Sequence, residues 1–269
     1  MTDSARFAWT VLLPVKVLAR AKSRLAVLAG DRRRELALAL ASDTVAAVLA
    51  CPEVARVVVV TSDQVAGPLL AALGAIVVPD EPADRAAGRG GASDHGGAGR
   101  GGASHGAASH GGAGSLDGAG PAGVLGDLGV QDALNAALSH GAAVAARRWP
   151  GTGLAALTAD LPAVSPAELA TALRAAGTAG TPPGLAAFVP DAAGVGTTLY
   201  AVPPGGEFRP LFGGASRARH AAAGATELAF DALTGLRRDV DTPDDLREAL
   251  TLGAGPRTTA LAAELLTDA

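Results

Sequence analysis

Cysteine is nearly absent from this chain of 269 residues, and aromatic residues make up only 3% of it. The single cysteine, Cys51, cannot form an intrachain disulfide and has no second thiol to complete a zinc site. A core with so few aromatic side chains must be built mainly from Val, Leu and Ala. The formal net charge of -4 at pH 7 argues against broad binding to nucleic acids or to membrane surfaces.

Long hydrophobic runs and glycine-rich phosphate motifs are also missing. The apolar stretch Trp9–Val15 is too short to span a membrane, and the residues before it lack the layout of a signal peptide. We therefore expect a cytoplasmic protein. Neither a dinucleotide-binding glycine motif nor a Walker lysine motif occurs, so a phosphate site in the loop after the first strand would depend on side-chain charge.

Short apolar runs alternate with helical patterns in the first part of the chain. Runs of strand length at residues 9–15, 55–61 and 75–79 are separated by helical spacing at residues 31–49 and 65–73. This alternation predicts an α/β fold with a mostly parallel sheet and helices on both faces. Downstream we expect strands at 154–160 and 236–241 and an antiparallel or skewed strand pair at 185–189 and 197–202. We expect helices at 132–148 and 165–176, within 212–222 and after Thr242.

Residues 86–123 interrupt this pattern. Fifteen of these 38 residues are glycine, and most of the others are Ala, Ser, His and Asp. Such a segment has little to bury and cannot offset the entropy of ordering it, so we expect a disordered insertion within a single domain of residues 1–269. His95, His105 and His110 are of the type found in metal-binding tracts, but a tolerated low-complexity insertion is the favoured interpretation.

One carboxylate ends a buried apolar run, because Asp160 closes the expected strand 154–160. A charge there is costly unless it is paired, protonated or bound to a metal. At the C-terminal end of a parallel strand, however, a carboxylate points into the crevice where α/β proteins bind ligands. Ser165 is the better cap for the next helix, since Pro166 follows it and Glu168 completes a capping box. We therefore interpret Asp160 as a functional acid.

A second pair of acids, Asp239 and Asp241, lies near the end of the chain. On a strand their side chains point to opposite faces, so only one can share a site with Asp160 unless the strand ends there. Two carboxylates from different strand ends suit Mg²⁺, which also takes phosphate oxygens and water. Asp241 has a structural alternative, as a cap with Thr242 for the helix that follows.

Polar loops complete the candidate site. The loop after the first strand carries Lys16, Lys22 and Arg24, and loops in this position often cradle phosphates, although a merely solvated basic loop is an equal alternative. The segments 194–198 and 212–217 combine small residues with hydroxyls, which can form an anion pocket through backbone amides. Together these loops indicate a second substrate that also carries a phosphate.

Several motifs in this order resemble one known family. They are Leu13–Lys16, Ala21–Leu25, Leu134–Leu138, Ala159–Pro162, Gly196-Thr197, Phe212-Gly213 with Ser216 and His220, and Asp239–Leu246. The chain resembles the CofC/FbiD family of coenzyme F420 biosynthesis, whose members are phosphoenolpyruvate or 2-phospho-L-lactate guanylyltransferases. The resemblance implies a three-layer Rossmann-like domain, similar to the MobA-like nucleotidyltransferases.

The resemblance also implies roles for individual residues. Lys16, Lys22, Arg24 and Asp160 would act in catalysis, and Ser23 and Asn135 would join the cationic residues in binding the nucleotide. Thr197, Gly213 and Ser216 would bind the acceptor, and Asp160, Asp239 and Asp241 would hold Mg²⁺. We expect His220 to have a supporting or surface role.

The implied reaction joins GTP to phosphoenolpyruvate or 2-phospho-L-lactate and releases pyrophosphate. The product would be labile and handed to the next enzyme of the pathway, and no nucleic acid or membrane partner is expected. One alternative is a MobA-like nucleotidyltransferase with another phosphorylated acceptor. Another is a non-catalytic binding module that recruits a partner through the insertion at 86–123.

Overall fold

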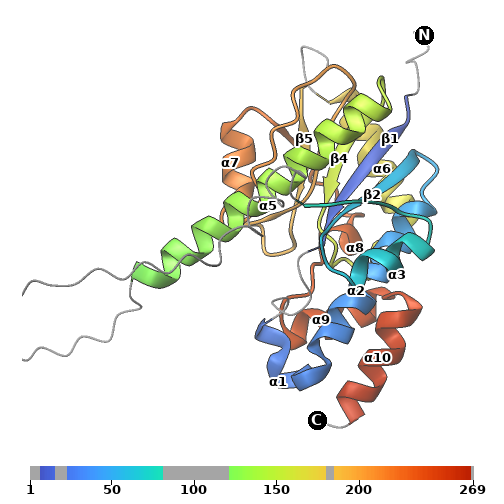
Figure 1. Cartoon of the computed structure of the whole chain (residues 1–269), viewed down its shortest axis with the longest axis vertical. Helices are drawn as coiled ribbons and strands as arrows, with labels where there is room; N and C mark the ends of the chain where they lie inside the picture. Colours follow the sequence, from blue (N-terminus) through green and yellow to red (C-terminus); the bar gives the residue numbers. More distant parts are fainter. Residues whose placement is uncertain (1–6, 16–22, 81–120, 180–184, 268–269) are drawn as a thin grey trace, which may run out of the picture.

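A mixed β-sheet forms the centre of the molecule (Figure 1). The computed structural model describes residues 7–15, 23–80, 121–179 and 185–267. The strands of this part of the chain are β1 (Trp9–Pro14), β2 (Val54–Val60), β3 (Ile76–Val78), β4 (Gly153–Leu157), β5 (Ala187–Pro190), β6 (Thr197–Val202) and β7 (Thr226–Glu227). They form one sheet in the order β3-β2-β1-β4-β6-β5-β7.

The pairing of these strands confirms the predicted, mostly parallel sheet. β1 is parallel to β2 and to β4, β2 is parallel to β3, and β5 is parallel to β7. Only β6 runs against its neighbours β4 and β5. The predicted antiparallel pair is thus confirmed, since residues 191–196 between β5 and β6 are too few for a helical crossover.

Helices cover both faces of the sheet and give the predicted three layers (Figure 1). On β1, Val11 and Leu13 join a hydrophobic cluster with α2 (Arg33–Leu49), α3 (Ala66–Ala72) and α6 (Pro166–Thr178). Leu12, between them, joins a second cluster with Leu138 of α5 (Pro121–Arg148). Neighbouring residues of a strand face opposite sides, so β1 is buried on both faces, as its continuous apolar run predicts.

A third cluster lies below the sheet, where the C-terminal helices α9 (Pro243–Leu252) and α10 (Pro256–Thr267) meet α2 and the short α1 (Ala26–Ala29) (Figure 1). The buried carboxylate of Asp43 on α2 accepts hydrogen bonds from the backbone amides of Arg257 and Thr258, at 3.3 and 2.7 Å. Asp43 thereby caps the first turn of α10 from another helix. The sequence patterns did not predict α10.

The two helix starts with the strongest sequence signals are confirmed. Ser165 caps α6 in a full capping box with Glu168, and Thr242 caps α9 in the same way with Asp245. Each helix has proline at its first position, where the missing amide hydrogen costs nothing.

Three expectations need correction. Residues 236–241 do not form a strand: the turn α8 (Thr234–Arg237) is anchored because the amide of Gly235 donates to Glu168 at 2.8 Å, and an irregular segment follows. The strand expected at 154–160 ends at Leu157. Helix α5 begins at Pro121, so residues 121–123 belong to a helix rather than to a disordered insertion, and residues 86–120 lie outside the described residues.

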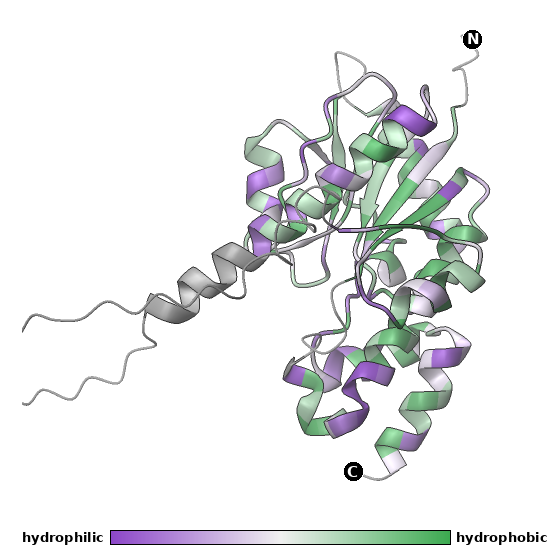
Figure 2. Ribbon diagram, viewed as in Figure 1, coloured by the Kyte–Doolittle hydropathy of each residue, from purple (hydrophilic) through white to green (hydrophobic). Residues whose placement is uncertain are grey.

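Hydropathy follows this architecture. Figure 2 shows mostly apolar central strands, with hydrophilic residues gathered on the outward surfaces of the helices and on the loops. Of the helices in the described part of the chain, none combines the length and the apolar composition needed to cross a membrane.

Candidate active site

The carboxyl edge of the sheet contains a switch point, where successive strands stop joining the sheet on one side of β1 and begin to join it on the other. From β1 the chain adds β2 and then β3 on one side, crosses back through α5 and adds β4 on the other side of β1. Open α/β sheets bind ligands outside the carboxyl ends of the strands at such a switch point. Because β1 and β4 are parallel neighbours, the carboxyl end of β1 and the segment that contains Asp160 after β4 lie at the same edge of the sheet.

Backbone hydrogen bonds fix the position of Asp160. Its carbonyl oxygen accepts a hydrogen bond from the Val240 amide at 3.1 Å, and the next amide, Leu161, donates to the Thr44 hydroxyl at 3.0 Å. The Thr158 amide donates to the Thr198 carbonyl at 2.9 Å. The peptides around Asp160 are therefore bound to three different segments of the chain, while its side chain is half-buried at the edge of the sheet.

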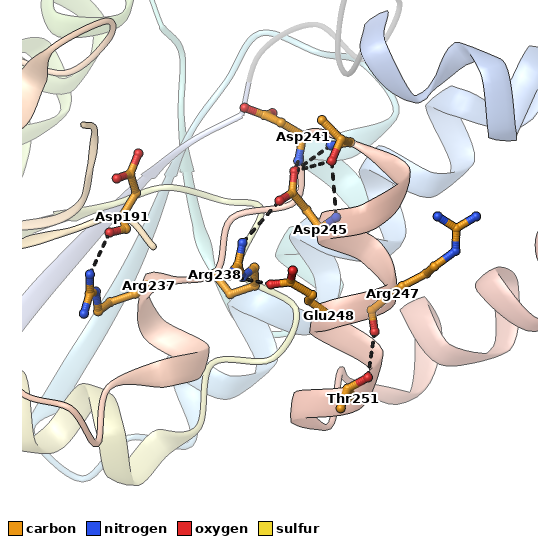
Figure 3. A network of polar contacts seen from close by, with 9 residues as sticks. Asp191, Arg237, Arg238, Asp241, Asp245, Arg247, Glu248 and Thr251 are labelled. Carbon is orange, nitrogen blue, oxygen red and sulfur yellow. Dashed lines mark hydrogen bonds and ion pairs between the residues drawn. The ribbon is translucent and has the colours of Figure 1, made fainter. Parts of the chain in front are cut away.

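The hydrogen bond from Val240 also brings Asp239 and Asp241 beside Asp160. Asp239 is half-buried and Asp241 is exposed. The cap predicted as an alternative for Asp241 is instead made by Thr242 in its capping box with Asp245, whose carboxylate accepts from the amides of Asp241 and Thr242 at 3.2 and 2.8 Å (Figure 3). The structure thus brings together acids that are about eighty positions apart in the sequence.

Arg238 holds this acidic segment in place. Its guanidinium lies 3.3 Å from the Asp245 carboxylate and forms a second ion pair with Glu248, so the segment is tied to α9 (Figure 3). The hydrogen bonds from Thr242 and Asp241, together with Arg238, outweigh the effect of burial and lower the pKa of Asp245. Asp245 is therefore ionised and structural at neutral pH.

The donor set is compatible with Mg²⁺ but not with an all-protein metal cage. Among the described residues, no group of three or more His, Cys, Asp or Glu side chains is arranged to hold a metal ion. Mg²⁺ is commonly held by one or two carboxylates together with substrate phosphates and water. Asp160 and Asp239, which belong to segments joined by the hydrogen bond from Val240 to Asp160, fit that mode of binding.

The cationic residues are only partly described. Lys16 and Lys22 lie outside the described residues. Ser23 and Arg24 form the first part of a 3₁₀ turn, Ser23–Leu25, and the Arg24 side chain is exposed. Their predicted contacts with a triphosphate stay predictions.

Thr197 reaches the same edge of the sheet from the opposite direction. Because β6 is antiparallel to β4, its first residues lie beside the last residues of β4, with Leu199 opposite Leu157. Thr197 therefore stands near the segment that carries Asp160. Its side chain is buried and lies at the start of β6.

The turn before Thr197 is held by Asp191, and this corrects one expectation. The two carboxylate oxygens of Asp191 accept from the amides of Val195 and Gly196, both at 2.8 Å, and the Gly194 amide donates to the Asp191 carbonyl at 3.2 Å. These amides are already used within the turn. The predicted anion pocket made of backbone amides is therefore wrong for residues 194–196, although it stays a prediction for the second loop.

Gly213 lies in that second loop, where the backbone requires glycine. Its φ is +94°, and a Cβ atom there would collide with the side chain of Gln131 on α5. Ser216, the first residue of α7 (Ser216–Ala222), is 2% exposed. The two predicted acceptor residues thus belong to one loop that packs against α5.

Asn135 of α5 fixes this loop through a reciprocal pair of hydrogen bonds. Its Oδ1 accepts from the Phe212 amide at 2.9 Å, and its Nδ2 donates to the Phe212 carbonyl at 3.1 Å. Nδ2 also donates to the Gln131 carbonyl at 3.0 Å, which uses both of its hydrogens. Asn135 therefore acts on the loop in this structure, and its contact with a nucleoside stays a prediction.

His220 is a further residue at this site whose place the sequence did not determine. It is fully buried on α7, which excludes the surface role and agrees with the supporting one. Its ring lies between Thr197 and the loop that carries Gly213. A lone histidine in a helical pattern carries no local signal for such a role, because both hydrogen-bond partners come from distant segments.

The strand order and the polar carboxyl edge define an open α/β fold with its candidate site at the switch point. A crystal structure from Desulfovibrio desulfuricans G20, described as a nucleotide-diphospho-sugar transferase, is similar to this fold with a TM-score of 0.51 at 13% identity, over 91% of this chain and 96% of that one. A comparison with models of protein families gave no match.

Two relatives identify the family more closely. The chain is 50% identical to the phosphoenolpyruvate guanylyltransferase of Thermomonospora curvata, over 98% of this chain and 92% of the relative. It is also 50% identical to the phosphoenolpyruvate guanylyltransferase of Streptomyces coelicolor, over 96% of this chain and 97% of the relative. The chain belongs to the phosphoenolpyruvate guanylyltransferase family.

Proposed function

We propose that this protein transfers the guanylyl group of GTP to phosphoenolpyruvate. A phosphate oxygen of phosphoenolpyruvate attacks the α-phosphorus of GTP in line, the bond from that phosphorus to the bridging oxygen of the β-phosphate breaks, and pyrophosphate leaves. The product is enolpyruvyl-diphosphoguanosine. The observation that carries the proposal is the 50% identity over nearly the whole chain to named phosphoenolpyruvate guanylyltransferases.

The nucleophile needs no activation by a side chain. A phosphate monoester has its second pKa near 6, so at neutral pH the attacking oxygen is already largely ionised. The difficulty is to bring two polyanions together with the reacting atoms aligned. This requirement agrees with a site of carboxylates, cations and hydroxyls in whose described part no histidine or cysteine is placed as a nucleophile.

Asp160 and Asp239, with Asp241 close by, would hold Mg²⁺, which when bound neutralises phosphate charge and fixes the geometry of the triphosphate. Lys16, Lys22 and Arg24, with Ser23, would bind the triphosphate. The support for this assignment is the position of Asp160 at the switch point beside the segment that contains Asp239.

Thr197, Gly213 and Ser216 would bind the phosphate and carboxylate of the acceptor. The antiparallel register of β6 supports this role, because it places Thr197 beside the end of β4 and close to the Asp160 segment. Asn135 and Gln131 hold the loop of Gly213 and thereby contribute to the acceptor site even without contact with the nucleoside.

The biological setting is part of the proposal. We infer that the reaction belongs to coenzyme F420 biosynthesis in the cytoplasm and that the labile product passes to the next enzyme. 2-Phospho-L-lactate differs from phosphoenolpyruvate by one double bond, so it is the alternative acceptor.

A matrix of substrates tests the proposed function. Pyrophosphate release is measured for each of the four nucleoside triphosphates with phosphoenolpyruvate, 2-phospho-L-lactate and 3-phosphoglycerate, with Mg²⁺ present or chelated. We expect the highest kcat/KM for GTP with phosphoenolpyruvate and no turnover in the presence of chelator. A preference for 3-phosphoglycerate, or turnover with no acceptor discrimination, would contradict the proposal.

A further inference from the structure

His220 lies fully buried in an aromatic environment at the junction of α7 with the sheet. Its ring stacks on Tyr200 of β6, with centroids 4.7 Å apart and planes inclined by 19°. Phe188 and Phe212 contact the same ring, at centroid distances of 5.6 and 5.5 Å. These contacts fix the orientation of the imidazole, whose hydrogen-bonding partners are the Leu211 amide, the Thr197 hydroxyl and the backbone of Ser216.

The partners of the two nitrogens determine the tautomer. The Leu211 amide donates to Nε2 at 3.0 Å, and since a backbone amide can only donate, Nε2 must carry no hydrogen. In a neutral ring the hydrogen is then on Nδ1. Nδ1 lies 3.0 Å from the Thr197 hydroxyl oxygen, so Thr197 can only accept from it, and the ring is a hydrogen-bond donor shared between Thr197 and the Ser216 backbone.

This direction of the hydrogen bond determines what the Thr197 hydroxyl can do. An oxygen that accepts from Nδ1 must point its own hydrogen elsewhere. In the described part of the chain, Thr197 Oγ1 has no second hydrogen-bond partner. Its hydrogen is therefore available to an acceptor atom supplied by a ligand, such as an anionic oxygen.

His220 also controls the loop on the other side of the acceptor site. Through Nε2 it binds the amide of Leu211, and through its ring it packs against Phe212, just before Gly213. Ser216 stands one helical turn before His220 on α7. One imidazole thus connects all three segments that carry the proposed acceptor residues.

We propose that His220 is a positioning residue for the acceptor, which holds the Thr197 hydroxyl as a donor aimed at an anionic oxygen of the three-carbon substrate. This inference rests on the proposed function, because it assigns the ligand of Thr197 to the acceptor. His220 itself contacts no substrate and transfers no proton.

Electrostatics keep the ring in the required form. Burial, and then the positive charge of Arg219, lower the pKa of His220 to about 4. A second hydrogen on Nε2 would face the donating amide of Leu211. The imidazole is therefore neutral throughout the neutral pH range.

Two substitutions of His220 separate the roles of its two ring nitrogens. In His220→Asn the amide nitrogen takes the place of Nδ1 and can still donate to Thr197. In His220→Gln the amide reaches the place of Nε2 and can still accept from Leu211, but the donor to Thr197 is lost. We expect His220→Gln to raise the KM for phosphoenolpyruvate about tenfold, equivalent to ~1.4 kcal/mol, with the KM for GTP changed less than twofold. We expect His220→Asn to stay within about threefold of the wild type.

A double-mutant cycle with Thr197→Val tests whether the effect passes through Thr197. If it does, Thr197→Val raises the acceptor KM to a similar extent, and adding His220→Gln raises it little further. Independent, additive effects would overturn the inference, as would a reversed order of the Asn and Gln variants or an equal rise in the KM for GTP. Melting temperatures of all variants identify losses of activity that come from a destabilised fold alone.

The tautomer is tested without any turnover. ¹⁵N NMR of histidine-labelled protein, with His220→Asn used to assign its signals among the five histidines, should show the Nδ1–H form at pH 7. An Nε2–H tautomer or a charged ring would overturn the inference even if a variant fails to fold. A wild type that releases no pyrophosphate with phosphoenolpyruvate would refute the proposed function, and the positioning role with it. An active wild type with an unchanged acceptor KM in His220→Gln would refute the positioning role alone.

Discussion

At the scale of single residues, Asp160 owes its place to bonds made by its peptide groups. Its carbonyl is bound by Val240 and the following amide by Thr44, while Thr158 is paired with β6. A carboxylate on such a fixed backbone has only its side-chain torsions to adjust, which favours a preorganised site. Substitutions that keep its size should therefore affect chemistry more than folding.

Asp160→Asn tests the proposed metal carboxylate. The amide has nearly the same shape but no charge, so we expect kcat/KM to fall about a hundredfold or more, equivalent to ~3 kcal/mol of transition-state stabilisation. The melting temperature should change little. Pyrophosphate release and thermal unfolding measure the two effects, with the exposed Asp241→Asn as a milder comparison. Near-wild-type turnover of Asp160→Asn would remove Asp160 from the metal site.

Asn135 offers a test between two roles. Because its amide anchors the Phe212 backbone in both directions, Asn135→Ala should destabilise the fold by about 1–3 kcal/mol and raise the acceptor KM more than the GTP KM. Ser139→Ala, one turn further along α5 on an exposed site, is the matched control and should change neither constant. A larger rise in the GTP KM for Asn135→Ala would instead support direct contact with the nucleoside.

His220 gives a pH dependence whose sign follows from its lowered pKa. The folded-state pKa is about 4 and the unfolded value about 6.5, so the unfolded chain binds more protons between these limits. The contribution of His220 to the free energy of unfolding is complete above pH 6.5 and is lost as the pH falls towards 4. The groups that act on the ring are Arg219 and the Ser216 backbone on its own helix, and the stacked Tyr200, which is neutral in this range since burial raises its pKa.

Denaturant unfolding at pH 7 and pH 5 measures this effect. We expect the wild type to lose about 2 kcal/mol more than His220→Asn between the two pH values. Since Asp245 and other carboxylates titrate in both proteins, their contribution cancels in the comparison. Equal losses in the two proteins would mean that the ring titrates normally in the folded state.

At the scale of elements, helix α2 supports the site from beneath the sheet. Its Thr44 hydroxyl donates to the Leu40 carbonyl at 2.8 Å and accepts from the Leu161 amide at 3.0 Å. The neighbouring Asp43 caps α10. One turn of α2 thereby connects the segment of Asp160 with the C-terminal helix.

Thr44→Val tests this connection, because it keeps the shape but leaves the buried Leu161 amide without its acceptor. We expect a loss of about 1–3 kcal/mol in unfolding free energy and a higher Mg²⁺ concentration for half-maximal activity. Thr44→Ser retains the hydroxyl and should restore both quantities most of the way. If Thr44→Val requires no more Mg²⁺ than the wild type, α2 supports the fold and not the site.

Elements with local signals were predictable. The capping boxes at Ser165 and Thr242 and the buried strands follow from nearest neighbours in sequence, and the structure confirms them. The expected strand at 236–241 was wrong because its backbone amides bond to Leu233, Gly235, Asp160 and Asp245 rather than to a neighbouring strand. Local hydrophobicity cannot distinguish these outcomes.

At the scale of the whole molecule, the segment between β3 and α5 can be tested by deletion. We expect replacement of residues 86–119 by a ten-residue Gly-Ser linker, which leaves α5 intact from Pro121, to keep kcat/KM within about threefold of the wild type. The entropy of closing a flexible loop changes only slowly with its length, so stability should change little as well. Loss of activity with an unchanged melting temperature would assign the segment a role in substrate binding.

The sequence alone determined most local elements and the α/β class, and it pointed to Asp160 as a candidate functional acid, because hydrophobic period, capping chemistry and a charge in an apolar run are local properties. Only the tertiary structure decided that the Val240 amide binds the Asp160 carbonyl. It also decided that Asn135 binds Phe212, 77 positions away, and that Thr44 binds Leu161, 117 positions away. It likewise decided that His220 turns Thr197 into a donor. Such contacts depend on strand order and helix packing. A side chain whose partner is distant in the sequence produces no periodic pattern in the residues around it.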